Sequence, residues 1–239
     1  MSSPLPDVPD VPAVPAVPAV PAVQLVLASA SPARRSTLRA AGVEPVVVVS
    51  EVDEDLTVAE ATDRYGPLEP ADISLLLARA KAEAVAALPE ADGALVLGCD
   101  SVFEFDGEAH GKPYTADVAR ERMLRMSGSA GVLHTGHWLV DCRDTDDDGG
   151  SGRGSGATVG AVASAEVSFL EMDPAEIDAY IATGEPLHCA GSFTIDGLGG
   201  AFVRKVDGDP HAVVGLSVST LRGLLASANV RITDLWPRR

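Results

Sequence analysis

A serine-rich turn followed by arginines is the first place where this sequence could perform chemistry. After a predicted buried strand, Ser31 fits the N-cap of a helix and Pro32 fits its first position, so Arg34 and Arg35 fall in the first turn. Cations there oppose the helix dipole by about 0.3–1 kcal/mol each, which favours an anion in front of them. Backbone N–H groups, the Ser29 and Ser31 hydroxyls and a guanidinium would together bind phosphate. Arginines that simply face water are the alternative.

Lysine is scarce in this chain. Of 18 basic residues only Lys81, Lys112 and Lys205 are lysines. Because most basic residues of this chain are arginines, a lysine suggests that its position needs a compact point charge, as beside a phosphate or an attacking water. Lys81 falls mid-helix, however, where a solvated face would be equally satisfied.

Asp100 follows the apolar run 94–98, and α/β proteins build their sites where strands end. An aspartate at that point can hold a divalent metal or orient a water molecule, and the alternative is a loop carboxylate that caps its own turn. Asp106 and Gly107 predict a hairpin turn, and the returning chain would bring Lys112 near Asp100.

The elements that must position these residues alternate between two patterns. Short Val/Leu runs interleave with helical periodicity, and a capping box at Asp173, Pro174 and Glu176 starts a further helix that stops at Gly184. The expected strands are 24–29, 45–50, 94–98, 102–105, 132–141, 166–172 and 201–206, and the other helices are 33–41, 73–88, 116–126 and 217–228. This predicts an α/β fold: a mixed β-sheet flanked by helices, with two lobes and a central cleft.

Two segments are expected to lie outside that fold. Residues 1–22 place proline at nearly every third position, which excludes helix and favours an extended, inert tail, although a docking peptide for a proline-binding partner is the alternative. Residues 143–160 are rich in Asp, Gly and Ser and predict a mobile surface loop. The domain is therefore assigned to residues 23–239.

Composition excludes several classes of protein. A chain of 239 residues with 46% apolar residues is no disordered regulator, and its charge of 18 − 35 = −17 argues against general binding to a nucleic acid polymer. No uncharged apolar stretch approaches the roughly 20 residues of a membrane helix. Three cysteines without a Cys-x-x-Cys pair indicate a reducing, cytoplasmic setting.

Taken together, the motifs resemble those of the Maf family of nucleotide pyrophosphatases, also called septum-formation proteins, over residue 24 to the C-terminal helix. The order and spacing of the motifs carry the resemblance. They are Ser29-x-Ser31-Pro32-x-Arg34, Ser50-Glu51-Val52-Asp53-Glu54, Ala80-Lys81-Ala82, Gly98-x-Asp100-Ser101, Gly111-Lys112-Pro113, Ser127-Gly128, His134-Thr135-Gly136, Gly184-Glu185-Pro186, Ala190-Gly191-x-Phe193-x-Ile195-Asp196-Gly197 and Val213-Val214-Gly215-Leu216.

The resemblance implies a fold like that of inosine triphosphatase and hydrolysis of a nucleoside triphosphate to the monophosphate and pyrophosphate with a divalent cation, Mg²⁺ or Mn²⁺. It implies a role for each matching residue. Asp100 is the catalytic proton acceptor and, with Asp53, a metal ligand, while the substrate-binding residues are Ser29, Arg34, Lys81, Ser101, Lys112 and Asp196.

Five positions depart from the family pattern. The family usually has arginine, threonine, lysine, glutamine and asparagine where this chain has Ala33, Ser101, Cys189, Asp196 and Ala212. Arg35 could partly replace the missing arginine, although it points about 200° away around the helix. An amide donates and accepts hydrogen bonds whereas a carboxylate only accepts, so the change at Asp196 leaves the preferred base open.

Two alternatives to this enzyme remain at this point. One is a regulator of cell division and septum formation that senses a nucleotide without turning it over. The other is a phosphatase that releases orthophosphate stepwise. The expected partner is a nucleoside triphosphate, with no nucleic acid polymer and no membrane, and a homodimer is left open.

Overall fold

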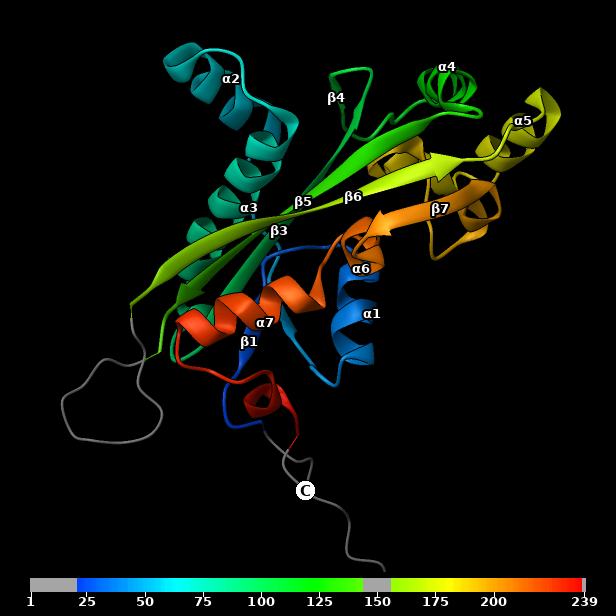
Figure 1. Ribbon diagram of the computed structural model, residues 1–239. Helices are drawn as coiled ribbons and strands as arrows, with labels where there is room; N and C mark the ends of the chain where they lie inside the picture. Colours follow the sequence, from blue (N-terminus) through cyan, green and yellow to red (C-terminus); the bar gives the residue numbers. More distant parts are fainter. Residues whose placement is uncertain (1–20, 144–155, 238–239) are drawn as a thin grey trace, which may run out of the picture.

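A computed structural model describes residues 21–143 and 156–237 of this chain. Within them, seven strands form one mixed sheet in the order β2-β1-β3-β5-β6-β7, with β4 paired to β3. β1 runs parallel to β2 and β3, and the remaining pairs are antiparallel. Helices flank this sheet on both sides (Figure 1), as the sequence predicts.

The strands are β1 (Leu25–Leu27), β2 (Val46–Val47), β3 (Leu95–Phe105), β4 (Glu108–His110), β5 (Ala130–Asp141), β6 (Thr158–Phe169) and β7 (Val203–Gly208). The α-helices are α1 (Pro32–Ala40), α2 (Glu54–Tyr65), α3 (Pro70–Ala86), α4 (Ala116–Met126), α5 (Pro174–Ala182), α6 (Pro210–Val214) and α7 (Val218–Ser227). Short 3₁₀ turns are η1 (Pro89–Ala91), η2 (Glu185–His188), η3 (Ala190–Ser192), η4 (Leu198–Phe202) and η5 (Ile232–Leu235).

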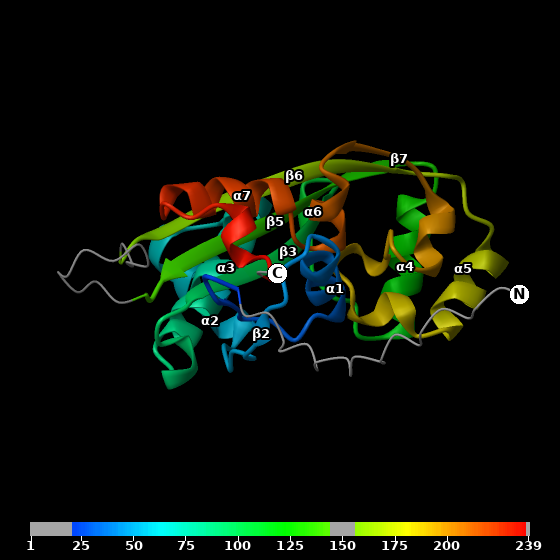
Figure 2. The ribbon, with the colours of Figure 1, turned by 90° about the horizontal axis from the view of Figure 1, so that it is seen from below.

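The long strand β3 divides the core by alternation of its side chains. Leu95 and Leu97 pack with residues of α7 on one face, and Phe103 packs farther along the same face with residues of α4 and α5. Seen from below, α7 and the α4–α5 pair accordingly lie toward opposite ends of the strands (Figure 2). Val96 points to the other face and packs against α3.

Glycines let α3 lie directly on the sheet. A Cβ built on Gly98 of β3 would be 2.1 Å from the Ala78 carbonyl oxygen, and one on Gly136 of β5 would be 2.2 Å from the Ser74 carbonyl oxygen. These distances are too short for any side chain, so both positions require glycine. The close contact determines how far a side chain on α3 must reach to touch the strands.

Local signals predict several element ends correctly. Ser31 caps α1 through its hydroxyl with Pro32 next to it, and Asp173 and Glu176 form the predicted capping box of α5. Asp106 and Gly107 both have positive φ, as a two-residue hairpin turn between β3 and β4 requires.

Other expectations were wrong. Asp100 lies in the middle of one continuous strand rather than past a strand end, because β5 pairs with β3 along the whole of 95–104. β6 begins at Thr158 instead of residue 166, so residues 158–160 pair with β5 and do not belong to a loop. Helix α2 was not predicted, because its first residues are acidic and its apolar periodicity is weak. Residues 1–20 of the predicted tail and 144–155 of the predicted loop lie outside the described residues, while Pro21 bridges to Pro237.

Candidate active site

Most of the predicted site residues gather beside an open stretch of β3. β1 pairs with β3 only over 95–97 and β4 only over 103–105, so in the described chain no strand covers residues 98–102 on that edge. The end of β1 and the beginning of α1 lie next to this gap, and the Cys99 carbonyl oxygen accepts a hydrogen bond from Arg34 Nη1 at 2.8 Å. A ligand placed at the gap would therefore lie against the edge of β3 and the beginning of α1.

Arg34 binds four protein oxygens around this gap and is only 9% exposed. Its Nε donates to the Gly215 carbonyl at 2.8 Å, Nη1 donates to Ser29 Oγ at 3.0 Å as well as to Cys99, and Nη2 donates to Ser101 Oγ at 3.1 Å. All but one of the guanidinium N–H groups thus have a protein acceptor. Arg34 is held rigidly and keeps a single donor, on Nη2, without a partner among the described residues.

Arg35 does not take the place of the missing family arginine. It lies on the exposed side of α1, where its Nη2 is 3.5 Å from Oε1 of Glu44. Arg35 thus points away from the gap, as helix geometry predicts. It does not supply the positive charge that the family's arginine at position 33 would bring.

Lys81 and Asp100 form a buried ion pair between α3 and β3. Lys81 Nζ lies 2.5 Å from Asp100 Oδ1, and the two residues are 8% and 6% exposed. The same ammonium lies 2.7 Å from Glu54 Oε1. Burying charges costs free energy unless they are paired, and here one lysine satisfies two carboxylates. Asp100 Oδ2 has no hydrogen-bond partner among the described residues.

Glu54, the first residue of α2, is a site residue that sequence reasoning missed. Its Oε1 contacts Lys81 and its Oε2 is 3.9 Å from Lys112 Nζ, so it lies between the two lysines. Partial burial alone would raise the pKa of Glu54, but the hydrogen bond from Lys81 and the charges of Lys81, Lys112 and Arg34 together lower it. These charges place all three cations within electrostatic reach of one carboxylate.

Asp53 was predicted as a metal ligand and serves in the structure as the N-cap of α2. Its side chain accepts the Leu56 N–H at 3.0 Å, and its carboxylate is exposed. Among the described residues it makes no hydrogen bond or ion pair with Asp100. An aspartate at an N-cap signals where a helix begins, so the sequence marks the start of α2 but not the contact of Glu54 with Lys81.

Asp100 and Ser101 face opposite sides of the sheet because they are neighbours in a strand. Ser101 Oγ lies 2.9 Å from Thr135 Oγ1 and accepts from Arg34, whereas Asp100 contacts Lys81. The predicted residues Ser29, Arg34 and Ser101 therefore form a group on one side, and Lys81, Asp100 and Lys112, joined by Glu54, form a group on the other. The open edge of β3 lies between the groups.

Asp196 is exposed, and its charge acts on Cys189. Burial raises the pKa of Cys189, the charges of Glu185 and Asp196 raise it further, and the charge of Lys112 opposes them. Cys189 thus lies within reach of the charges of both Asp196 and Lys112. The structure places no hydrogen bond or ion pair on Asp196 among the described residues.

Two buried groups near the cations, Cys99 and His137, offer no free nucleophile: the first is a protonated thiol and the second has its Nε2 lone pair in a hydrogen bond. Burial raises the pKa of the Cys99 thiol to about 12, despite the charges of Arg34 and Lys81. Burial and the charge of Arg34 lower the pKa of His137 to about 4, so this imidazole is neutral and its Nε2 accepts the Ser217 N–H at 2.8 Å.

The donor atoms near Asp100 suit a hard divalent cation that is shared with a substrate. No group of three or more His, Cys, Asp or Glu side chains in the described residues could hold a metal ion by itself. Mg²⁺ usually binds proteins through one or two carboxylates and takes its other ligands from water and phosphate. The free Asp100 Oδ2 fits that mode.

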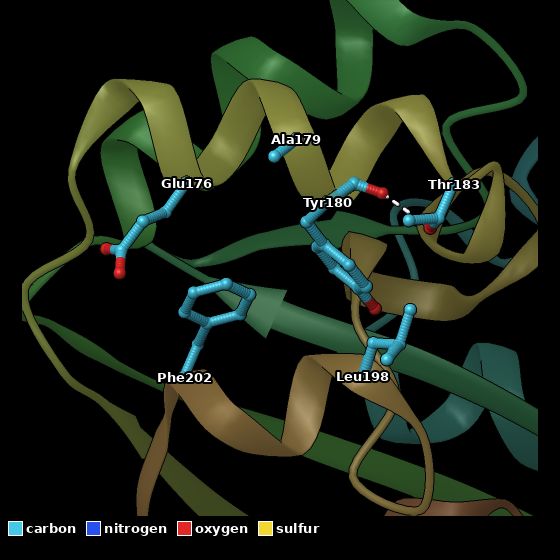
Figure 3. A pocket seen from close by; sticks show the side chains of 6 residues that line it. All are labelled: Glu176, Ala179, Tyr180, Thr183, Leu198 and Phe202. Carbon is cyan, nitrogen blue, oxygen red and sulfur yellow. Dashed lines mark hydrogen bonds between the residues drawn. The ribbon is translucent and has the colours of Figure 1, made fainter.

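Two further findings concern the rest of the molecule. A shallow pocket of about 300 Å³ is lined by Glu176, Ala179, Tyr180, Thr183, Leu198 and Phe202 (Figure 3), and it includes none of the predicted site residues. In the described part of the chain, no helix combines the length and apolar character that a membrane span needs.

Comparison with known proteins adds to this geometry. Residues 24–228 match the sequence profile of a family described as Maf-like protein. A protein of Leifsonia xyli subsp. xyli named nucleoside triphosphate pyrophosphatase is 53% identical over 217 residues, covering 90% of this chain and 97% of the relative. Proteins with the same name from Salinispora tropica and Nocardia farcinica are 51% and 48% identical, covering 90% and 89% of this chain and 88% and 96% of the relatives. The chain therefore belongs to the Maf-like protein family.

Proposed function

We propose that this chain hydrolyses a nucleoside triphosphate to the nucleoside monophosphate and pyrophosphate by attack of water on the α-phosphorus. The observation that carries the proposal is the buried contact of Lys81 with Asp100 and Glu54, with Arg34 and Lys112 close enough to affect the same carboxylate. A chain of net charge −17 gathers cations here. A triphosphate is the polyanion that such a cluster suits, and the relatives' names agree with it.

The cations would share the work of holding the phosphate oxygens. Lys81 has a third N–H group beyond its two carboxylate partners, Lys112 has an exposed ammonium, and Arg34 has one free donor on Nη2. Ser29 and Ser101 would bind through their hydroxyls. Because phosphoryl transfer depends mainly on positioning and charge stabilisation, no covalent nucleophile is required.

Asp100 would act on the attacking water. Lys81 holds Oδ1 at 2.5 Å, which fixes the carboxylate plane and leaves Oδ2 to orient the water and accept its proton. When bound, Mg²⁺ or Mn²⁺ would neutralise charge on the phosphates. Asp100 would be one ligand, and Asp53, whose Oδ1 caps α2, would have only its Oδ2 to offer. Cys99 is a protonated thiol and the Nε2 lone pair of His137 is taken by the Ser217 N–H, so neither group competes with Asp100 for the role of base.

A product-resolved panel tests this proposal. The purified chain is incubated with each common nucleoside triphosphate and Mn²⁺, and pyrophosphate, orthophosphate and nucleotide products are quantified separately. We expect pyrophosphate and monophosphate in equal amounts, and their loss in Asp100→Asn. Tight binding without product would instead support the nucleotide-sensing regulator, and orthophosphate with a diphosphate intermediate would support the stepwise phosphatase.

A further inference from the structure

One carboxylate outside the phosphate site holds together the segment that carries Asp196. Glu185 lies at the start of η2, and its Oε1 accepts hydrogen bonds from Tyr180 OH at 2.9 Å and from the Gly199 N–H at 3.0 Å. Oε1 also accepts from the Thr194 hydroxyl in a short bond, and Oε2 accepts the Leu198 N–H at 3.1 Å. A single side chain therefore binds both ends of the segment 194–199.

The segment closes tightly around these bonds. A Cβ on Gly197 would be 2.8 Å from Glu185 Oε1, and a Cβ on Gly199 would be 2.5 Å from Tyr180 OH. Tyr180 OH also accepts the Thr194 N–H at 3.2 Å. Figure 3 shows Tyr180 extending from α5 toward Leu198 at the beginning of η4. The conformation of the segment thus depends on Glu185 and Tyr180.

Only an ionised carboxylate suits this arrangement. All four groups around Glu185 donate, and a carboxylate offers lone pairs to all of them. Burial would raise the pKa of Glu185, but the hydrogen bonds from Thr194, Gly199, Leu198 and Tyr180 outweigh it and lower that pKa. A glutamine would direct an N–H group at one of these donors and leave at least one bond unmade.

Asp196 lies between the two ends that Glu185 binds. Turn η2, which Glu185 begins, contacts the segment that carries Lys112, because the Leu187 carbonyl accepts the Tyr114 N–H at 3.0 Å. We infer that Glu185 is a positioning residue that fixes Asp196 beside the Lys112 side of the nucleotide site and so sets which nucleoside triphosphates the chain discriminates. This inference rests on the proposed function, with Asp196 as a substrate-binding residue. Glu185 itself would not touch the phosphates or the reacting water.

The test compares kcat/KM over the full panel of triphosphates for the wild type, Glu185→Gln and Glu185→Asp. Misplacing a contact residue by about 1 Å can cost up to about 10²-fold, so we expect the ratio between the best and the poorest substrate to fall at least about tenfold in Glu185→Gln. KM for the best substrate should rise more than its kcat falls, because the phosphate site is untouched. Glu185→Asp keeps the charge and should restore a large part of the ratio.

Glu176→Gln is the matched control. Glu176 lies on the neighbouring α5 and its Oε2 accepts the Asp173 N–H, a bond that an amide oxygen can also accept. It should leave the substrate ratio unchanged. An equal fall in kcat/KM for every triphosphate in Glu185→Gln, or an unchanged ratio, would overturn the inference.

Two further measurements cover the remaining outcomes. If Glu185→Gln does not fold, Tyr180→Phe removes one donor to the same carboxylate and should lower the ratio by a smaller factor, about threefold, and no change there would count against the inference. If the wild type releases pyrophosphate from no triphosphate, the proposed function fails separately. Calorimetric affinities for the same panel then test Glu185, and they should lose discrimination in Glu185→Gln.

Discussion

Lys81 Nζ lies 2.5 Å from Asp100 Oδ1, although one residue belongs to a helix and the other to a strand of the central sheet. The contact depends on Gly98, two residues before Asp100 on the same face of β3, where a Cβ would be 2.1 Å from the Ala78 carbonyl. Ala78 lies about one helical turn before Lys81. The glycine therefore sets the spacing at which the ion pair forms.

Gly98→Ala should destabilise the fold and weaken catalysis together. Separating α3 from β3 costs about 3 kcal/mol by analogy with overpacked cores, which lowers Tm by roughly 6–12 °C in a domain of this size. Thermal unfolding with a parallel activity assay measures both effects. Gly223→Ala on the exposed face of α7, where a Cβ meets nothing within 4 Å, is the control and should be neutral or slightly stabilising. A Gly98→Ala variant as stable and active as the wild type would show that the close approach is unimportant.

Asp100→Asn should abolish hydrolysis without unfolding the chain. Lys81 keeps Glu54 as a partner, so the loss of one charge leaves no unpaired lysine, while the base for water is gone. We expect kcat to fall by about 10²–10⁴-fold, measured by pyrophosphate release at saturating substrate. Asp178→Asn removes an exposed partner of Arg120 and should leave kcat unchanged. Activity of Asp100→Asn within a few-fold of the wild type would exclude Asp100 as the base.

Glu54 should be coupled to Lys81 more strongly than to Lys112. The Lys81 contact is short and buried, whereas Lys112 is 3.9 Å away with 39% of its side chain exposed. Double-mutant cycles with Glu54→Gln, Lys81→Met and Lys112→Met, measured by denaturant unfolding, should give about 1–3 kcal/mol for the first pair and about 0.5 kcal/mol or less for the second. Equal coupling energies would contradict the geometry.

His137 should make the fold sensitive to mild acid. Its pKa in the folded chain is lowered to about 4, against an ordinary value of 6.5, by burial and by the charge of Arg34. Between these two pH values the unfolded chain binds a proton that the folded chain does not, so the free energy of unfolding falls as the pH falls. The full loss is roughly 3 kcal/mol.

Unfolding measured from pH 7 to pH 4.5 in the wild type and in His137→Gln tests this. The stability advantage of the wild type over the variant should shrink as the pH falls. A constant difference for His137→Gln would contradict the buried neutral imidazole.

Local signals in the sequence predicted what depends on short stretches of chain. Ser31 and Pro32 marked the beginning of α1, and Asp106 and Gly107 marked the hairpin, because caps and turns rely on neighbouring backbone groups. The stretch 98–101 looked like the end of a strand, since Gly and Asp disfavour strands. Pairing with β5 overrode that preference and kept β3 continuous through Asp100.

The parts of the site that were missed depend on packing between distant segments. Glu54 meets Lys81 only because α2 and α3 pack together, which no local pattern near Glu54 encodes. Arg34 was predicted to contact phosphate, and three of its four protein acceptors, on Cys99, Ser101 and Gly215, come from elements far away in the sequence. Asp53 was predicted as a metal ligand, but aspartate also suits a helix N-cap, and the Asp53 side chain caps α2.

Hydrolysis in ¹⁸O-labelled water tests the central claim most directly, because the reacting phosphorus retains the oxygen of the attacking water. The purified chain is given its best triphosphate, and both products are analysed by mass spectrometry. Attack on the α-phosphorus, directed by Asp100 between Lys81 and the phosphate chain, predicts one labelled oxygen in the monophosphate and none in the pyrophosphate. Label in pyrophosphate or in orthophosphate would contradict the account.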